Sequence, residues 1–384
     1  MSSTKIGIHV IKAVPPSNMN RGQDGTPKNA IIGGLTRSRL STQSIKYAIR
    51  LLYLQEKGIR SRELSVFIDP LVELGHPVAD VEKVVKAFVK LFFGKLNEKD
   101  ESRLGAMVFI SGQEHKDIIN SLHENFDRAI SELDSNGDIL PKTKFYEDLA
   151  KKLTTQFSKF VSSIDLALFG RMMASNSDLQ MDSSVFVADA ISTHYSPAQP
   201  EWFTGMDDRA AQAGMLETTF FTSATFYFNF NVDWDQLVSN LGGNTQLARQ
   251  GLAAFLKGSF LALPGGKKSS HFAHTEPGLL FVEIRDGEIL TYANAFEASV
   301  KSEKGSGYMG PSAKAFAKHL PYAYRSIGKP LDAYGLIGSL PVEEALSGTI
   351  LDPNPENDKE KKLNVHWKES IDDLVESIVE RVTQ

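Results

Sequence analysis

The sequence predicts an α+β fold, and three observations lead to this class. Before and after a central block, apolar and polar side chains alternate with the period of two that half-buried strands show. Between about Arg60 and Arg171 the apolar residues recur at helical spacing instead. With this block removed, the remaining elements follow the order strand, helix, strand, strand, helix, strand. That order is the one found in a ferredoxin-like or RRM-type domain.

The first predicted strand runs from about Lys5 to Val14 and ends at Pro15, because a proline cannot continue a hydrogen-bonded ladder. A helix is predicted to begin at Ser41. Four apolar side chains of this helix are spaced at i, i+3, i+4 and i+7, which gives it a face that can be buried. These residues are Ile45, Ala48, Ile49 and Leu52.

The central block contains three helical patterns. The first ends at Gly94, the second follows the capping-box pair Ser111 and Glu114, and the third runs from about Lys144 to Leu168. We therefore expect the block to fold as a helical subdomain that is inserted into the sheet domain.

The domain boundaries follow from these patterns. The sheet domain is predicted to comprise residues 1–57 and 187–384, and the inserted helical subdomain residues 58–186. Within the sheet domain, residues 196–226 are rich in Pro, Gly, Asp and aromatic side chains, which predicts a protruding loop or β-hairpin. A chain of 384 residues is long enough for such a division into domains.

Charge is distributed unevenly along the chain. The stretch from Asn20 to Arg50 carries six Lys or Arg residues against one acid, Asp24, which gives +5 in a chain whose formal net charge is −5. The remainder therefore sums to −10. A basic stretch on an acidic protein suits a polyanion better than a small neutral substrate.

The helix that begins at Ser41 has a polar face opposite its apolar stripe. Glycines in the loop before it allow a backbone to approach a phosphate closely, and the helix start offers unpaired N–H groups to an anion. A solvated surface with scattered cations is the commoner explanation of a basic helix face alone, but the glycine-rich basic loop favours phosphate binding. The polar face consists of Gln43, Lys46, Tyr47 and Arg50.

Composition and motifs exclude several classes of protein. The chain has no cysteine, so disulfides and thiolate-bound metals are excluded. No apolar run approaches the roughly 20 residues of a membrane span, and the start lacks a signal-peptide pattern, so we expect a cytoplasmic protein without membrane contact. Gly265-Gly266-Lys267-Lys268 departs from the phosphate-loop motif, and His271 with His274 lacks a third ligand, so we expect no cofactor and no metal.

Two pairs of residues favour contact with stacked bases. Trp202 and Phe203 lie among Pro, Gly and acidic residues rather than in a periodic segment, as do side chains that wedge between bases. Arg171 beside Met172 again combines a cation with an apolar group. Burial in an ordinary core is the alternative for each apolar member.

Several motifs together resemble the family of crRNA-binding backbone subunits of the type I-E CRISPR Cascade effector, often called CasC. They occur in the family's order over most of the chain. The motifs are Asn20-Arg21, Pro27-Lys28, Gly33-Gly34, Ser41 to Lys46, Asp165 to Met172, Ala190 to His194, Trp202-Phe203-Thr204 with Asp207-Asp208, and Ala293 to Glu297.

The resemblance implies a hand-like protein with an RRM-type palm, helical fingers and a hairpin thumb. Copies of the protein would line up along one crRNA, and each thumb would displace a base so that the bases between can pair with a target DNA strand. The implied partners are crRNA, target DNA, neighbouring copies and other Cascade subunits, in antiviral defence. Protein contacts would hold the backbone while base pairing reads the sequence.

Individual residues acquire roles from the resemblance. It implies that Met172 and Phe203 wedge at the displaced base, with Arg171 and Thr204 beside them. Lys267 and Lys268 match a basic loop. The residues implied to hold the guide RNA are Arg21, Lys28, Ser41, Gln43, Ser44, Lys46 and Arg50.

We expect no enzymatic activity, and two alternatives stay open. A backbone subunit could also cut its bound target with a metal ion held by Asp207 or Asp208, although adjacent carboxylates in a polar loop are usually only solvated. The other alternative is an RNA-binding protein that does not polymerise.

Overall fold

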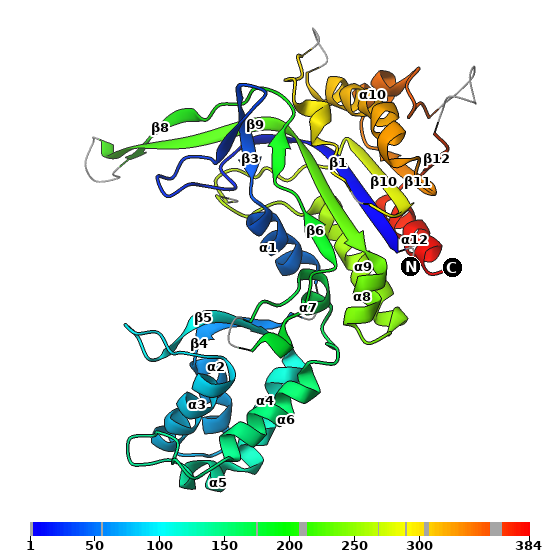
Figure 1. Cartoon of the computed structure of the whole chain (residues 1–384). Helices are drawn as coiled ribbons and strands as arrows, with labels where there is room; N and C mark the ends of the chain where they lie inside the picture. Colours follow the sequence, from blue (N-terminus) through cyan, green and yellow to red (C-terminus); the bar gives the residue numbers. More distant parts are fainter. Residues whose placement is uncertain are drawn as a thin grey trace. The chain divides into compact units, whose positions relative to one another are not determined.

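The computed structural model divides into two units, which are described separately (Figure 1). It describes residues 3–54, 57–173, 176–206, 213–267, 269–288, 290–302, 307–353 and 363–384. The first unit comprises Met1–Tyr53, Val185–Asp235 and Leu252–Gln384, and the second Leu54–Ser184 and Gln236–Gly251. The predicted α+β class is confirmed, because helices accompany a large, mostly antiparallel sheet.

The first unit is built on this sheet. Its strands lie in the order β12-β11-β10-β1-β9-β7-β3-β2, and β6 also pairs with β9. Neighbours are antiparallel except β11 and β12, which are parallel. The strands are β1 (Thr4–Ser17), β2 (Asn29–Ile32), β3 (Leu35–Leu40), β6 (Val185–Val187), β7 (Ala190–Ser192), β9 (Ala213–Asp233), β10 (Leu279–Asp286), β11 (Asp332–Ile337) and β12 (Val365–Trp367).

Strand β1 extends further than predicted. It continues to Ser17 instead of ending at Pro15. The register with β9 shifts between Val14 and Ser17, so the prolines lie where the ladder is irregular and no backbone donor is required. Along the regular part, alternate side chains point to opposite faces of the sheet. Ile6 and Ile8 are fully buried on one face, and His9 lies on the other.

Helices cover both faces of the sheet. On one face, Phe255 of α9 (Thr245–Leu261) packs edge-on against Phe230. On the other, Phe316 of α10 (Met309–Ile327) contacts Phe281. The remaining helices that include residues of this unit are α1 (Thr42–Tyr53), α8 (Trp234–Asn240), η2 (Ala293–Phe296), α11 (Leu340–Leu346) and α12 (Ile371–Val382).

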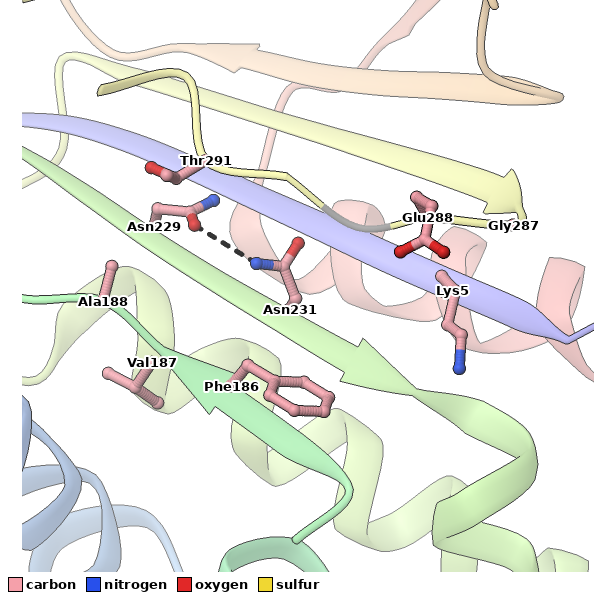
Figure 2. A pocket seen from close by; sticks show the side chains of 9 residues that line it. All are labelled: Lys5, Phe186, Val187, Ala188, Asn229, Asn231, Gly287, Glu288 and Thr291. Atoms are coloured by element: carbon pink, nitrogen blue, oxygen red, sulfur yellow. Dashed lines mark hydrogen bonds between the residues drawn. The ribbon is translucent and has the colours of Figure 1, made fainter. Parts of the chain in front are cut away.

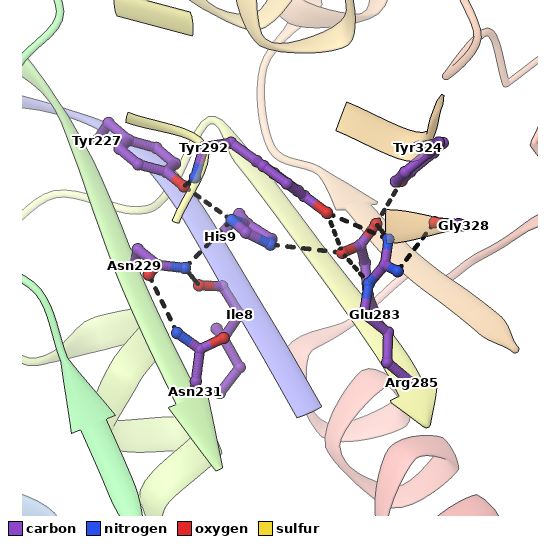
Figure 3. A network of polar contacts seen from close by, with 10 residues as sticks. All are labelled: Ile8, His9, Tyr227, Asn229, Asn231, Glu283, Arg285, Tyr292, Tyr324 and Gly328. Carbon is purple, nitrogen blue, oxygen red and sulfur yellow. Dashed lines mark hydrogen bonds and ion pairs between the residues drawn. The ribbon is translucent and has the colours of Figure 1, made fainter. Parts of the chain in front are cut away.

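A buried polar network lies on the α10 face of the sheet (Figure 3). The Glu283 carboxylate accepts hydrogen bonds from Arg285 Nε (3.0 Å), from the Tyr292 hydroxyl (2.8 Å) and from the Tyr324 hydroxyl. His9 Nε2 lies 3.8 Å from the same carboxylate. Burial alone would raise the pKa of Glu283, but His9 and the Arg285 guanidinium outweigh it and lower this pKa to about 2.

The second unit contains helices and a short two-stranded sheet. The sequence predicts a helical subdomain, and the structure adds the antiparallel pair of β4 and β5. The predicted capping box of Ser111 and Glu114 is confirmed, with both reciprocal hydrogen bonds. The elements are β4 (Ile59–Glu63), α2 (Ser65–Glu73), α3 (Val78–Phe92), β5 (Arg103–Ile110), α4 (Gly112–Glu124), α5 (Phe126–Ser131), α6 (Phe145–Phe157), α7 (Ile164–Phe169) and η1 (Ser177–Leu179).

Residues Gln236–Gly251 belong to the second unit, whereas the predicted boundaries place them in the sheet domain. The Asn240 side chain donates to the Ala167 carbonyl (2.9 Å), and the Asn240 carbonyl accepts from the Val161 N–H (3.0 Å). Both the side chain and the backbone of Asn240 thus connect the segment to residues distant in sequence, and apolar spacing does not reveal such contacts.

Candidate nucleic-acid interface

The loop after β1 is held in a defined shape by its own hydrogen bonds. The Asn18 side chain donates to the Gly25 carbonyl (3.0 Å), and the Gly22 N–H donates to the Thr26 carbonyl (2.8 Å). Asp24 accepts from the Thr26 hydroxyl and N–H, and these bonds lower the pKa of its carboxyl group. This leaves the Arg21 side chain exposed on an ordered loop.

At the start of α1, the Ser41 and Thr42 N–H groups already have acceptors within the protein and are not offered to an anion as the sequence predicted. Asp189 Oδ1 accepts from the Thr42 N–H at 2.7 Å, and Asn20 Oδ1 accepts from the Ser41 N–H at 2.8 Å. The same Asp189 pairs with Arg39 at 2.8 Å. Burial would raise the pKa of Asp189, but the hydrogen bonds from Thr42 and the Arg39 charge lower it overall.

Replacing Asp189 with alanine is therefore expected to destabilise the protein by about 1–2 kcal/mol, since the cap of α1 and the partner of Arg39 are both lost. Urea denaturation measures the change. Asp286→Ala, at an exposed aspartate, is the control and is expected to stay within about 0.5 kcal/mol of the wild type. Equal stability of the two variants would contradict this assignment of Asp189.

The basic stretch divides into structural and exposed cations. Arg37 is fully buried and donates to the Ser192 carbonyl (3.0 Å) and the Phe296 carbonyl (3.1 Å), and this burial lowers its pKa. Arg39 is paired with Asp189. The charge of +5 counted from the sequence is therefore larger than the number of unpaired, exposed cations that this surface can offer to a polyanion.

The predicted RNA-binding residues of this region differ in exposure. Ser41 is buried and directly precedes α1. Its carbonyl accepts a hydrogen bond from the Ser44 N–H in the first turn of that helix. Burial lowers the pKa of Lys46. The exposed residues are Arg21 and Gln43, and the half-buried ones are Lys28, Ser44, Lys46 and Arg50.

The aromatic segment lies on a β-hairpin. Strand β8 (Gln199–Met206) pairs antiparallel with the first part of β9, with Phe203 opposite Glu217. Trp202 is 69% exposed and Phe203 38% exposed. Because side chains alternate along a strand, Thr204 lies on the face of Trp202 and not on that of Phe203. The implied placement of Phe203 and Thr204 beside one base therefore does not fit the alternation.

A third segment meets the base of this hairpin. Lys267 Nζ donates to the Thr219 hydroxyl on β9. A Cβ atom at Gly266 would lie 2.5 Å from the Met19 carbonyl oxygen, so the loop packs tightly against the segment that precedes Arg21. Two segments more than 200 positions apart in the sequence, the loop after β1 and the loop with Lys267, are thus in contact at Gly266.

Arg171 and Met172 belong to the second unit and have different surroundings. Arg171 is buried, where Nη1 pairs with Glu114 Oε1 at 2.6 Å and Nε donates to the Leu179 carbonyl at 2.7 Å. Its guanidinium therefore has a structural role and does not offer a cation to RNA, contrary to the sequence-based expectation. Met172 is 82% exposed. With Met107 and Met173 it lines a cavity of about 220 Å³.

The first unit also has a pocket of about 570 Å³ (Figure 2). One side is apolar and is formed by Phe186 to Ala188, and the other carries the amides of Asn229 and Asn231. None of the predicted RNA-binding residues that the structure describes lines it. The interface we consider is therefore an exposed surface and not this pocket.

Some predictions lie beyond the described residues. Lys268, Asp207 and Asp208 are outside the described ranges. Within those ranges, no group of three His, Asp or Glu side chains is arranged to hold a metal ion. In the same part of the chain, no helix combines the length and apolar character that crossing a membrane requires.

Comparison with known proteins places the chain in a family. A sequence model of the family described as CT1975-like protein matches residues 6–375. The chain belongs to this family. No curated protein sequence matches this CT1975-like protein.

Solved structures share the fold of this CT1975-like protein. A chain described as "CRISPR RNA-guided surveillance complex, pre-nicking" aligns with a TM-score of 0.81 and 23% identity, covering 98% of this chain and 99% of that one. A chain described as "CRISPR RNA-guided surveillance complex" aligns with a TM-score of 0.72 and 20% identity, at the same coverage. The fold is therefore matched over nearly the whole length.

Proposed function

We propose that this protein is a non-catalytic backbone subunit of a type I-E CRISPR Cascade complex, of the CasC type. It polymerises along crRNA, holds the RNA backbone and presents guide bases to a target DNA strand in antiviral defence. The observation that carries the proposal is the meeting of three segments in the first unit. The loop with Arg21, the Lys267 loop and the base of the hairpin are joined by close contacts.

The chemistry of this surface suits a strand backbone. Arg21 and Lys28 lie on a loop whose shape is fixed by backbone hydrogen bonds, so the backbone loses little conformational freedom when they contact phosphates. These groups are cations and not base-specific donors, and they therefore hold a strand without reading its sequence. The solved chains with this fold come from RNA-guided surveillance complexes, which supports RNA as the polyanion.

The sheet supports assigning the first unit as an RRM-type palm. Strands β10, β1, β9 and β7 are adjacent in that order and antiparallel, as in a ferredoxin-like sheet whose fourth, first, third and second strands are neighbours. The hairpin of β8 and β9 is then the thumb, and the second unit the fingers.

The proposal is tested by the mass of the complex on single-stranded RNAs of increasing length, measured by light scattering after size exclusion. We expect the mass to rise in steps, with a fixed number of nucleotides per added copy. One copy at every length would remove the backbone role. Regularly spaced cleavage of bound target DNA in magnesium would contradict the non-catalytic part.

A further inference from the structure

Phe272 is an exposed aromatic residue on the loop between α9 and β10. Its side chain is 77% exposed, and its ring lies beside that of His274 with centroids 5.5 Å apart. Leaving a phenyl ring in water forgoes the stabilisation that burial would provide. Single exposed apolar residues are common, so the surroundings of Phe272 decide whether this one has a role.

The loop that carries Phe272 is held at both ends. The Ser270 and His271 N–H groups donate to the Lys267 carbonyl at 3.1 and 2.9 Å and close a turn directly before Phe272. On the other side of Phe272, the Thr275 hydroxyl donates to the Ala13 carbonyl at 2.5 Å. The backbone of residues 269–275 is therefore tied on both sides of Phe272, so that contact with a flat ligand loses little conformational freedom.

Cations lie at the start of this loop, and the acid Glu276 follows its end. Lys267 is at its start, and Gly266 packs on the Met19 carbonyl, next to the segment with Arg21. An exposed ring beside cations is the combination by which proteins hold single-stranded nucleic acid, since bases stack on the ring and phosphates meet the charges. A protein partner would be expected to bury the ring in an apolar surface, whereas this loop carries the cation Lys267 and the ring beside Phe272 is that of His274.

We propose that Phe272 stacks on a base of the single-stranded nucleic acid held by the first unit. This inference rests on the proposed function, because it requires a bound strand. It adds a contact that neither the motifs nor the hairpin provides. The base is expected to come from the guide RNA, and a base of the target DNA is the other source with the same chemistry.

The test compares Phe272→Ala, Phe272→Trp and the control Tyr322→Ala, which removes another exposed ring of the same unit. Each protein is titrated into single-stranded RNA at several salt concentrations. We expect Phe272→Ala to bind about tenfold more weakly with an unchanged salt slope, because stacking releases no counterions. Phe272→Trp and Tyr322→Ala are expected to bind like the wild type.

The source of the base is identified with 2-aminopurine, whose fluorescence falls on stacking, placed at successive positions of the RNA or of an added complementary DNA strand. Quenching that is lost in Phe272→Ala supports the inference, and the labelled strand that shows it is the strand whose base stacks on Phe272. If the wild type binds RNA and Phe272→Ala matches it, stacking is overturned while the scaffold role survives. If Phe272→Ala instead alters only the number of copies per RNA, the ring contacts a second copy and stacking is overturned. Absence of RNA binding by the wild type would overturn both.

Discussion

Replacing Arg21 and Lys28 together with alanine is expected to weaken single-stranded RNA binding about tenfold at physiological salt. Each lost phosphate contact removes roughly 0.7 from the slope of log affinity against log salt, so the double variant is expected to lose about 1.4. The weakening is expected to be the same for RNAs of different sequence, because phosphates are identical in all of them. Fluorescence anisotropy at a series of salt concentrations measures both quantities.

The control for this experiment carries the same change of charge elsewhere in the first unit. Lys314 and Lys318 lie on α10, and their replacement with alanine alters net charge equally. If the control weakened RNA binding as much as the Arg21 and Lys28 variant, a general effect of net charge would explain the loss. A wild-type salt slope in the Arg21 and Lys28 variant would also contradict phosphate contact.

Replacing Glu283 with glutamine is expected to destabilise the protein by about 3 kcal/mol. The change removes the negative charge that faces Arg285 and leaves a buried guanidinium without its partner, which is among the costliest single changes. Glutamine keeps the shape of the side chain, so a lower free energy of unfolding would be due to the lost charge and not to a cavity. Urea denaturation measures it, with the exposed Glu288→Gln as the control. Equal stability of both variants would show that the network contributes little.

The same carboxylate gives the stability a predictable dependence on pH. The pKa of Glu283 falls from an ordinary value of 4.5 to about 2 in the folded protein. A lowered folded-state pKa means that its contribution is complete above pH 4.5 and is lost as the pH falls towards 2. The stability difference between the wild type and Glu283→Gln is therefore expected to shrink over this interval. If the stability difference stayed constant down to pH 2, altered packing and not the charge of Glu283 would explain the destabilisation.

Local patterns predicted several elements but not always their limits. The stripe of α1 is buried at Ile45, Ala48 and Ile49, as its spacing indicated. Leu52 is 50% exposed, because it lies one residue before the end of the helix, where the core no longer covers it. Periodicity identifies a face of a helix, whereas the extent of burial depends on what packs against it.

The site was less predictable, because its geometry depends on distant partners. Asp189 caps α1 from a position 147 residues after Thr42, and no local pattern connects the two. Arg37 and Arg171 count as cations in the sequence, but their buried partners are visible only in the fold. The opposite faces of Phe203 and Thr204 follow from strand periodicity once the segment is known to be a strand. Composition had indicated only a loop or hairpin.

Strand β9 makes the hairpin and the central sheet one continuous piece of backbone. Ala213 to Phe221 pair with β8, and Thr222 to Asp233 pair with β1, with the register shift between Val14 and Ser17 close to the junction. The hairpin is therefore a continuation of a strand of the central sheet, and Lys267 contacts its base through Thr219. The core therefore sets the direction in which the hairpin points. If copies assemble along a strand as proposed above, each hairpin would point in the same direction relative to its own sheet, and this would fix the number of nucleotides between successive hairpins.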